Sequence, residues 1–184
     1  MKHEIERRKP KGFRDYLSLA VTTCGVGYLP LAPGTWGSLL AVGFYVLLAK
    51  LFGAFRYKPS LAEPEFMVAA IHAVILIAFL LFILLGIWSA GRATQMLGDL
   101  DPSQAVIDEV IGQLIVFLFI PFTWSWWLIG LGFGLFRLFD VWKPYPIDYL
   151  QNLPAGIGVC ADDILAGVYA GVCLSVVYAI SLSV

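Results

Sequence analysis

Long runs of apolar residues constrain the fold of this chain more than any other feature. Four of them, residues 36–55, 66–88, 124–139 and 163–182, approach the roughly 20 residues with which a helix crosses a hydrocarbon core about 30 Å thick. Residues 105–122 make a fifth run. Only 14% of the residues are charged and 60% are hydrophobic, whereas an ordinary soluble domain is roughly 25% charged. We therefore expect an all-α integral membrane protein, a bundle of about five transmembrane helices.

Residues 17–31 are also apolar, but they do not fit a straight transmembrane helix because Gly25, Gly27 and Pro30 interrupt them. Irregular backbone is tolerated at membrane depth only where protein covers it or where it lines a polar cavity. We expect an N-terminal re-entrant or interfacial segment at this place.

The positions of the basic residues predict the orientation of the bundle. Lys and Arg accumulate in cytoplasmic loops, and with the N-terminus inside and five crossings only Lys50, Arg56 and Lys58 of the 12 basic residues fall outside. Residues 1–16 are then a basic cytoplasmic tail and residues 17–184 a helical membrane region. We expect the 184 residues to form a single membrane domain, since no repeat or linker divides them.

Acidic residues gather at the cytoplasmic ends of the predicted helices. They include the adjacent pairs Asp108-Glu109 and Asp162-Asp163, and Asp140 lies between the pairs. Each pair alone could be no more than the negative charge common at a helix N-terminus, worth up to about 1 kcal/mol. Together, carboxylates in a region of low dielectric repel one another unless a cation joins them. We predict that all five bind Mg²⁺ or another hard divalent cation, which oxygen ligands favour.

Candidate phosphate-binding groups lie near these acids. Arg137 and Lys143 flank the acid between the pairs, and their cations would complement phosphate oxygens. Arg137 could instead form only an ion pair with the acid three residues on. The first predicted span opens with Gly34, Thr35 and Ser38, where a hydroxyl can cap the helix and free amides can bind an anion. A turn with a helix cap would explain these three residues equally well.

Other routes of phosphate-ester hydrolysis lack their residues in this chain. There is no Cys-x₅-Arg sequence for a cysteine phosphatase and no Asp-x-Asp-x-Thr sequence for an aspartyl-phosphate enzyme. His3 belongs to the predicted tail and His72 to the opposite membrane face, so neither is placed to act as a nucleophile beside the acids. Metal-assisted attack by water is the route that these residues favour.

Two other classes of membrane protein also use acidic side chains. A transporter or ion channel would spread them through the bilayer along one path, whereas these gather at one end. A phospholipid headgroup phosphotransferase would bind Mg²⁺ too, but its Asp-Gly-x₂-Ala-Arg…Gly-x₃-Asp-x₃-Asp pattern is absent. Both classes stay as alternatives to a hydrolase. A net charge of −1 argues against a nucleic-acid partner, since such proteins carry a concentrated basic face.

Four motifs carry a resemblance over residues 17–171. They are GVG with PGTWGS (25–27 and 33–38), VIDEVIGQ (106–113), FRLFDVWKPYP (136–146) and GIGVCADDILAG (156–167). In this order they resemble the phosphatidylglycerophosphatase A family, bacterial membrane enzymes that dephosphorylate phosphatidylglycerophosphate. The chain departs from the family's pattern in Ala155, where Gly is expected, and in Tyr145, where Trp is expected.

The resemblance implies a Mg²⁺-dependent phosphoric monoester hydrolase of phospholipid biosynthesis. Its substrate would be a phospholipid of the bilayer, phosphatidylglycerophosphate, and its products phosphatidylglycerol and phosphate. It also implies a multi-pass protein of the bacterial inner membrane whose active site faces the cytoplasm and is built from the acidic residues of the motifs.

Overall fold

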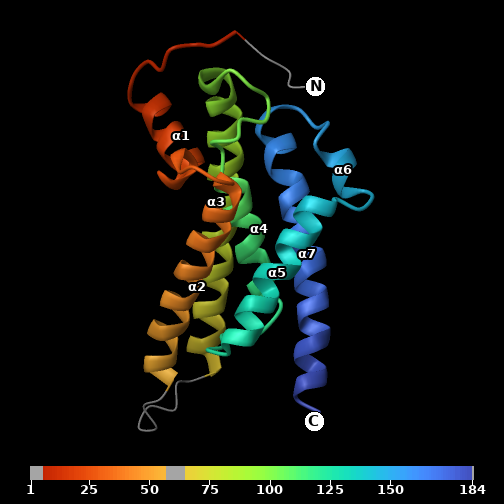
Figure 1. The fold of residues 1–184 in the computed structure, drawn as a ribbon. Coiled ribbons are helices and arrows are strands. Elements are labelled where there is room, and N and C mark those ends of the chain that lie inside the picture. The colour runs from red at the N-terminus through yellow and green to blue at the C-terminus, as the bar shows by residue number, and fades with distance from the viewer. Residues whose placement is uncertain (1–5, 57–64, 184) are drawn as a thin grey trace.

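The computed structural model describes residues 6–56 and 65–183, and within these ranges it contains seven α-helices, one short 3₁₀ helix and no strand (Figure 1). The elements are α1 (Phe13–Thr23), η1 (Val26–Tyr28), α2 (Pro33–Arg56), α3 (Glu65–Leu97), α4 (Ile107–Leu118), α5 (Trp126–Trp142), α6 (Ile147–Leu150) and α7 (Ala155–Ser181). The predicted all-α fold is confirmed.

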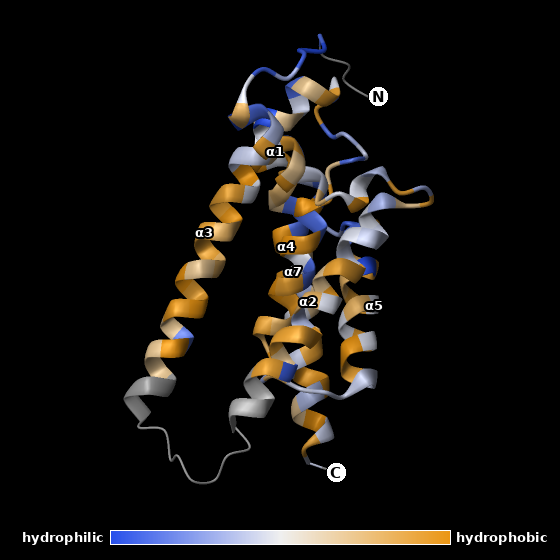
Figure 2. Cartoon of the chain, turned by 90° about the vertical axis from the view of Figure 1, so that its left-hand side faces the viewer, coloured by the Kyte–Doolittle hydropathy of each residue, from blue (hydrophilic) through white to orange (hydrophobic). Residues whose placement is uncertain are grey.

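Three helices are long and apolar enough to cross a membrane. They are α2 over Pro33–Leu51, α3 over Ala69–Leu97 and α7 over Ala155–Ser181. They correspond to three of the predicted spans. Only 6% of the most apolar part of α3 is buried inside the protein, and Figure 2 shows this helix as hydrophobic along most of its length, with much of it apart from α2. Such a surface suits contact with lipid chains.

The two other predicted spans fall on shorter helices. α4 has 12 residues and α5 has 17, so at about 1.5 Å per residue they extend roughly 18 and 26 Å, less than the ~30 Å hydrocarbon core. α4 ends three residues before Pro121, because proline cannot continue a helix. The loop after it is fixed to α2, since the Thr123 N–H donates a hydrogen bond to the Tyr45 hydroxyl (3.0 Å). The α4–α5 hairpin thus extends alongside α2, and a count of five crossings stays a prediction.

Residues 17–31 do not form one straight helix. α1 ends at Thr23, because Cys24 (φ 46°) and Gly25 (φ 71°) adopt left-handed backbone conformations. The chain then turns through η1 before Pro33 opens α2, a position that proline favours. With 11 residues, α1 is too short to span the hydrocarbon core, in line with the expected re-entrant or interfacial segment.

A buried ion pair holds the N-terminal segment against α3. Asp15, in the first turn of α1, is fully buried; Arg8 and Arg92 form ion pairs with it at 2.9 and 2.6 Å. The Lys11 N–H donates a hydrogen bond to the same carboxylate (2.7 Å). The hydrogen bonds from Arg8, then that from Lys11, then that from Arg92 hold the pKa of Asp15 well below its usual range. The predicted tail of residues 1–16 therefore ends in ordered, packed structure.

The helix α7 packs against α3, α4, α5 and α6. Its backbone touches that of α4: a Cβ on Gly112 would lie 2.5 Å from the carbonyl oxygen of Asp163, and a Cβ on Gly167 would overlap the Gly112 carbonyl. Small residues permit such close approach of membrane helices. Gly112 and Gly167 therefore allow α4 and α7 to touch.

The prediction that Asp162 and Asp163 open a transmembrane helix is wrong. α7 begins at Ala155, eight residues before Asp163, so both acids lie inside the helix. The early start is stabilised by contact with α3, because Gly156 packs directly against the backbone of Ile87. The acidic pair is thereby placed below the end of the bundle rather than at it.

Candidate metal centre and active site

Three of the predicted acids meet where α4 and α7 touch. Asp108 and Glu109 lie in the first turn of α4, and Asp163 lies across from them on α7. One carboxylate oxygen of each lies within 4.8 Å of the others. Asp108 and Asp163 are buried and Glu109 is half-buried. This group of residues, here called the acid cluster, has a size and composition that could hold a metal ion.

Several oxygens in and beside the acid cluster are buried without a hydrogen-bond partner among the described residues. They are Oδ1 of Asp108, Oε2 of Glu109 and Oδ1 of the adjacent Asp162. A buried anionic oxygen without a partner is costly unless a cation or a donor compensates it. The acid cluster therefore fits a hard divalent cation, for which carboxylate oxygens are the preferred ligands.

The other two predicted acids are paired with the basic residues predicted to bind phosphate. Arg137 Nη1 lies 2.5 Å from Asp140 Oδ2, and Lys143 Nζ donates a hydrogen bond to Asp162 Oδ2 at 2.5 Å. The structure thus brings three of the five acids within ligand reach of one another and places the other two in ion pairs. The i, i+3 pair that the sequence allowed for Arg137 is present.

The start of α2 lies against the acid cluster. A Cβ on Gly34 would overlap the Glu109 carboxylate, and a Cβ on Gly37 would lie 2.9 Å from the carbonyl oxygen of Val106. Glycine at these two positions lets the first turns of α2 and α4 come together. Gly34, predicted as a phosphate-binding residue, is therefore adjacent to the acids.

The predicted helix-capping roles of Thr35 and Ser38 are wrong. α2 begins at Pro33, so both residues lie inside the helix. The Ser38 hydroxyl donates a hydrogen bond to the Gly34 carbonyl (3.1 Å), and the Thr35 N–H donates one to the Ala32 carbonyl (3.0 Å). The amide of Thr35 is consequently not free to bind an anion, whereas its half-buried side chain lies one residue from Gly34.

One further polar residue near the site was missed from the sequence. Gln113 is fully buried, and neither of its amide atoms has a hydrogen-bond partner among the described residues. It follows Glu109 by four residues and so shares its face of α4. A single amide side chain in an otherwise apolar run was the sequence feature that could have identified it as a candidate site residue. Burial, with the charge of Glu109 adding to it, raises the pKa of the Cys24 thiol to about 11. That thiol stays protonated at neutral pH, which agrees with the absence of a cysteine-phosphatase sequence.

Comparison with known proteins identifies the family. Residues 19–178 match the family described as Phosphatidylglycerophosphatase A. The chain belongs to the phosphatidylglycerophosphatase A family. The family predicted from the motifs is confirmed, and with it the expectation of a phosphatase that acts on a phospholipid.

Three relatives are similar over most of their length. A Bacteroides thetaiotaomicron protein provisionally named a phosphatidylinositol-3-phosphatase is 36% identical over 157 residues, 84% of this chain and 89% of its own. Phosphatidylglycerophosphatase A of Haemophilus influenzae is 37% identical over 148 residues, 79% of this chain and 78% of its own. Phosphatidylglycerophosphatase A of Escherichia coli is 32% identical over 145 residues, 78% of this chain and 73% of its own. No solved structure matches the chain.

Proposed function

We propose that this protein hydrolyses the terminal phosphomonoester of phosphatidylglycerophosphate in phospholipid biosynthesis, giving phosphatidylglycerol and phosphate. The acid cluster carries the proposal, because three carboxylate oxygens within 4.8 Å, some without a partner, suit metal-assisted hydrolysis. Family membership supports the substrate, since two of the relatives bear the name of this activity.

We propose Mg²⁺ as the cofactor, held by Asp108, Glu109 and Asp163. The all-oxygen donor set supports this choice, because Mg²⁺ is a hard cation that binds carboxylates and keeps several waters. When bound, the ion supplies Lewis-acid polarisation of the phosphoryl group and a lowered pKa for water. Asp140 and Asp162, predicted as further ligands, instead hold Arg137 and Lys143 in place in this proposal.

Protein groups around the acid cluster bind and orient the substrate. Arg137 and Lys143 complement the charge on the phosphate oxygens. The Gly34 backbone and the Thr35 side chain contact the phosphate at the start of α2, where the helix dipole favours an anion. The hydrogen bond from Ser38 to the Gly34 carbonyl fixes that turn. Glu109, the half-buried acid, would accept the proton of the attacking water through the carboxylate oxygen that does not bind the ion.

We further propose that the chain forms one multi-pass domain of the bacterial inner membrane, with the acid cluster toward the cytoplasm. The distribution of basic residues supports this orientation. Arg8 and Arg92 both form ion pairs with Asp15, and Arg92 lies five residues before the end of α3. Lys50, predicted to lie outside, packs over the Trp124 ring (6.0 Å to its centroid) in the loop between α4 and α5.

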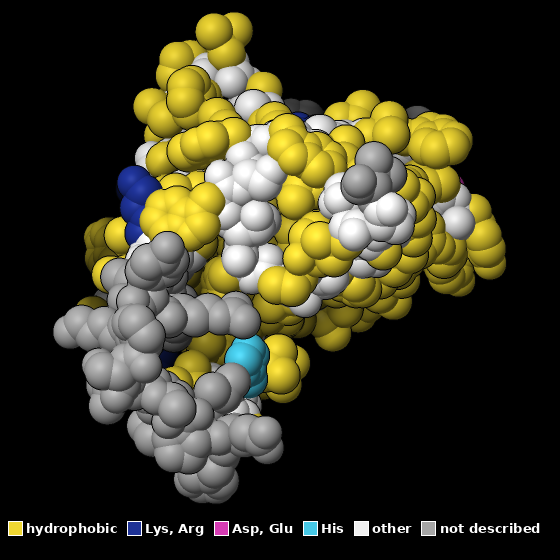
Figure 3. Space-filling view, turned by 90° about the horizontal axis from the view of Figure 1, so that it is seen from below, with side chains coloured by type: hydrophobic (Ala, Val, Ile, Leu, Met, Phe, Trp, Pro, Cys, Tyr) yellow, Lys and Arg dark blue, Asp and Glu magenta, His cyan; other side chains and the backbone are white. Residues whose placement is uncertain are grey.

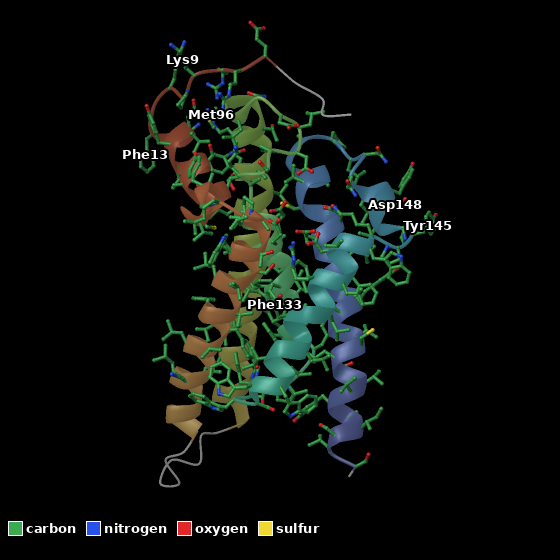
Figure 4. All side chains as sticks on the ribbon, in the orientation of Figure 1. Lys9, Phe13, Met96, Phe133, Tyr145 and Asp148 are labelled. Atoms are coloured by element: carbon green, nitrogen blue, oxygen red, sulfur yellow. The ribbon has the colours of Figure 1, made fainter. Side chains whose placement is uncertain are left out.

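The test is phosphate release by purified protein in detergent. Phosphatidylglycerophosphate should be hydrolysed with Mg²⁺ and not with EDTA, and Asp163→Asn should abolish release. Asp148→Asn is the matched control, because this aspartate on α6 is exposed and points away from the bundle near the equally exposed Tyr145 (Figure 4); it should keep full activity. Undiminished release in EDTA would exclude metal-assisted hydrolysis. Faster hydrolysis of phosphatidylinositol 3-phosphate would replace the proposed substrate.

A further inference from the structure

A large apolar groove separates α3 from α2 and α4. Its volume is about 1060 Å³, above the ~300–1,000 Å³ of most small-molecule pockets. The walls are aliphatic and aromatic side chains, among them Leu40 and Phe44 of α2, Phe79 and Phe82 of α3, and Leu114 and Phe119 of α4. Such a lining accepts hydrocarbon, and its polar members are Cys24, Tyr45 and His72.

The groove exists because two helices that follow each other in the sequence do not pack. The described residues of α2 and α3 do not pack together, and Figure 2 shows much of α3 apart from α2. Most of α3 lies open to the surroundings, so the groove opens sideways to the bilayer. An apolar space of this size left empty would forfeit dispersion contacts along all its walls.

The groove lies beside the proposed active site. Val110, the residue after Glu109, lines it, and so does Cys24, whose thiol pKa the charge of Glu109 helps to raise. The same helix serves both places, because α2 contributes Gly34 to the site and Leu40 to the groove. A single molecule with a phosphate head and an apolar tail could therefore occupy both.

Aromatic side chains line the far part of the groove, where α2 lies beside the loop after α4. Tyr45 stacks on Phe117 and Phe122 (ring centroids 4.2 and 5.7 Å apart), and its hydroxyl holds the loop after α4 through Thr123. Figure 3, which looks at this end from below, shows a face dominated by hydrophobic side chains. From Leu40 to Leu48 the groove follows α2 for about 12 Å at 1.5 Å per residue. One leaflet of the hydrocarbon core has a thickness of roughly 15 Å.

We propose that this groove binds an acyl chain of the lipid substrate while its phosphomonoester lies at the acid cluster. The inference rests on the proposed function, which it extends from the headgroup to the tail. The position of the groove beside the site selects the substrate's own chain over a bulk lipid, and the finite length of the groove limits how much of the chain is contacted. Affinity should then depend on acyl length up to the length of the groove and little beyond it.

The experiment fills the groove and compares substrates of different acyl length. Ala78 of α3 lines the groove and is exposed, so Ala78→Trp fills part of it without entering the packed core. Ala73→Trp is the matched control, because Ala73 is also exposed on α3 but does not line the groove. For phosphatidylglycerophosphate with 16-carbon chains, Ala78→Trp should lower kcat/KM about tenfold, mainly through KM. With four-carbon chains both variants should match the wild type.

Equal losses for both chain lengths, or equal losses in both variants, would overturn the proposal. A second measurement needs no catalysis: a phosphatidylglycerol probe with a diazirine midway along one acyl chain should label Phe79, Phe82 or Leu114, and Ala78→Trp should reduce the labelling. Labelling only of the outward-facing Leu80 and Leu84, equal labelling by a phosphatidylcholine probe, or a cross-link between two protein chains would each overturn it. If labelling occurs as expected but no phosphate is released, the proposed function fails and the groove assignment stands.

Discussion

A methyl group at Gly112 should separate the two halves of the acid cluster. Its Cβ would lie 2.5 Å from the carbonyl oxygen of Asp163 and 2.5 Å from Cε2 of Phe136, whereas ordinary contacts begin at 3.4 Å. Neither neighbour yields easily, because the first is helix backbone and Phe136 is completely buried. In Gly112→Ala, α4 and α7 should therefore move apart by about 0.9 Å, the difference between 3.4 and 2.5 Å.

That displacement sets the expected loss of activity. Misplacing catalytic groups by about 1 Å costs roughly 10²-fold in rate, which corresponds to about 2.7 kcal/mol of transition-state stabilisation. Overpacking should also lower the free energy of unfolding by about 1–3 kcal/mol. We expect phosphate release by Gly112→Ala to fall about a hundredfold at saturating Mg²⁺ and phosphatidylglycerophosphate, with a measurable drop in melting temperature in detergent.

Gly134→Ala is the matched control for this prediction. Gly134 lies within α5, and a Cβ added to it would have no neighbour within 4 Å. This variant should keep wild-type activity and stability. If Gly112→Ala released phosphate within about twofold of the wild-type rate, the close contact between α4 and α7 would not be what positions the acids.

Two further predictions concern charge. Without divalent cations, Asp108→Asn should melt at a higher temperature than the wild type, because one of three mutually repelling carboxylates is gone. Mg²⁺ should raise the melting temperature of the wild type alone. An equal rise in the variant would contradict binding of the ion at the acid cluster. Acid should weaken the fold through Asp15, whose pKa the hydrogen bonds from Arg8, Lys11 and Arg92 lower from its usual 3.8. The stabilisation is complete above that value and is lost as pH falls through the lower folded-state pKa. The difference in melting temperature between the wild type and Asp15→Asn should thus narrow below about pH 4, and a constant difference would contradict it.

The helices, and the place where the acids of two helices meet, can be predicted from local sequence patterns. Apolar runs long enough to span a bilayer can satisfy their backbone only as helices. Gly112 and Gly167 indicate where two such helices can touch, and the acids of α4 and α7 lie within one turn of these glycines. The spacing of small and acidic residues in the sequence therefore indicates where α4 and α7 make the contact that assembles the acid cluster.

Features that depend on contacts between residues far apart in the sequence could not be predicted from local sequence patterns. The ion pair between Asp15 and Arg92 joins residues 77 positions apart. The sequence around either residue does not indicate that the other is its partner. The start of α7 was misplaced because charge at Asp162 and Asp163 resembled a helix beginning, whereas contact between Gly156 and α3 extends the helix upstream. The groove arises from a failure of α2 and α3 to pack, which no periodicity within either helix encodes.

The observed start of α7 determines how deep in the bundle the acid cluster lies, and so how the enzyme reaches its substrate. Asp163 lies eight residues into α7, about 12 Å along the helix, so the acid cluster lies below the end of the bundle and beside the groove. A lipid phosphate can reach such a site while its acyl chains stay among apolar side chains. Lifting a 16-carbon chain into water would instead cost about 0.8 kcal/mol for each methylene exposed. In the proposed function, the depth of the acids and the open side of the bundle together allow hydrolysis of a molecule that stays in the membrane.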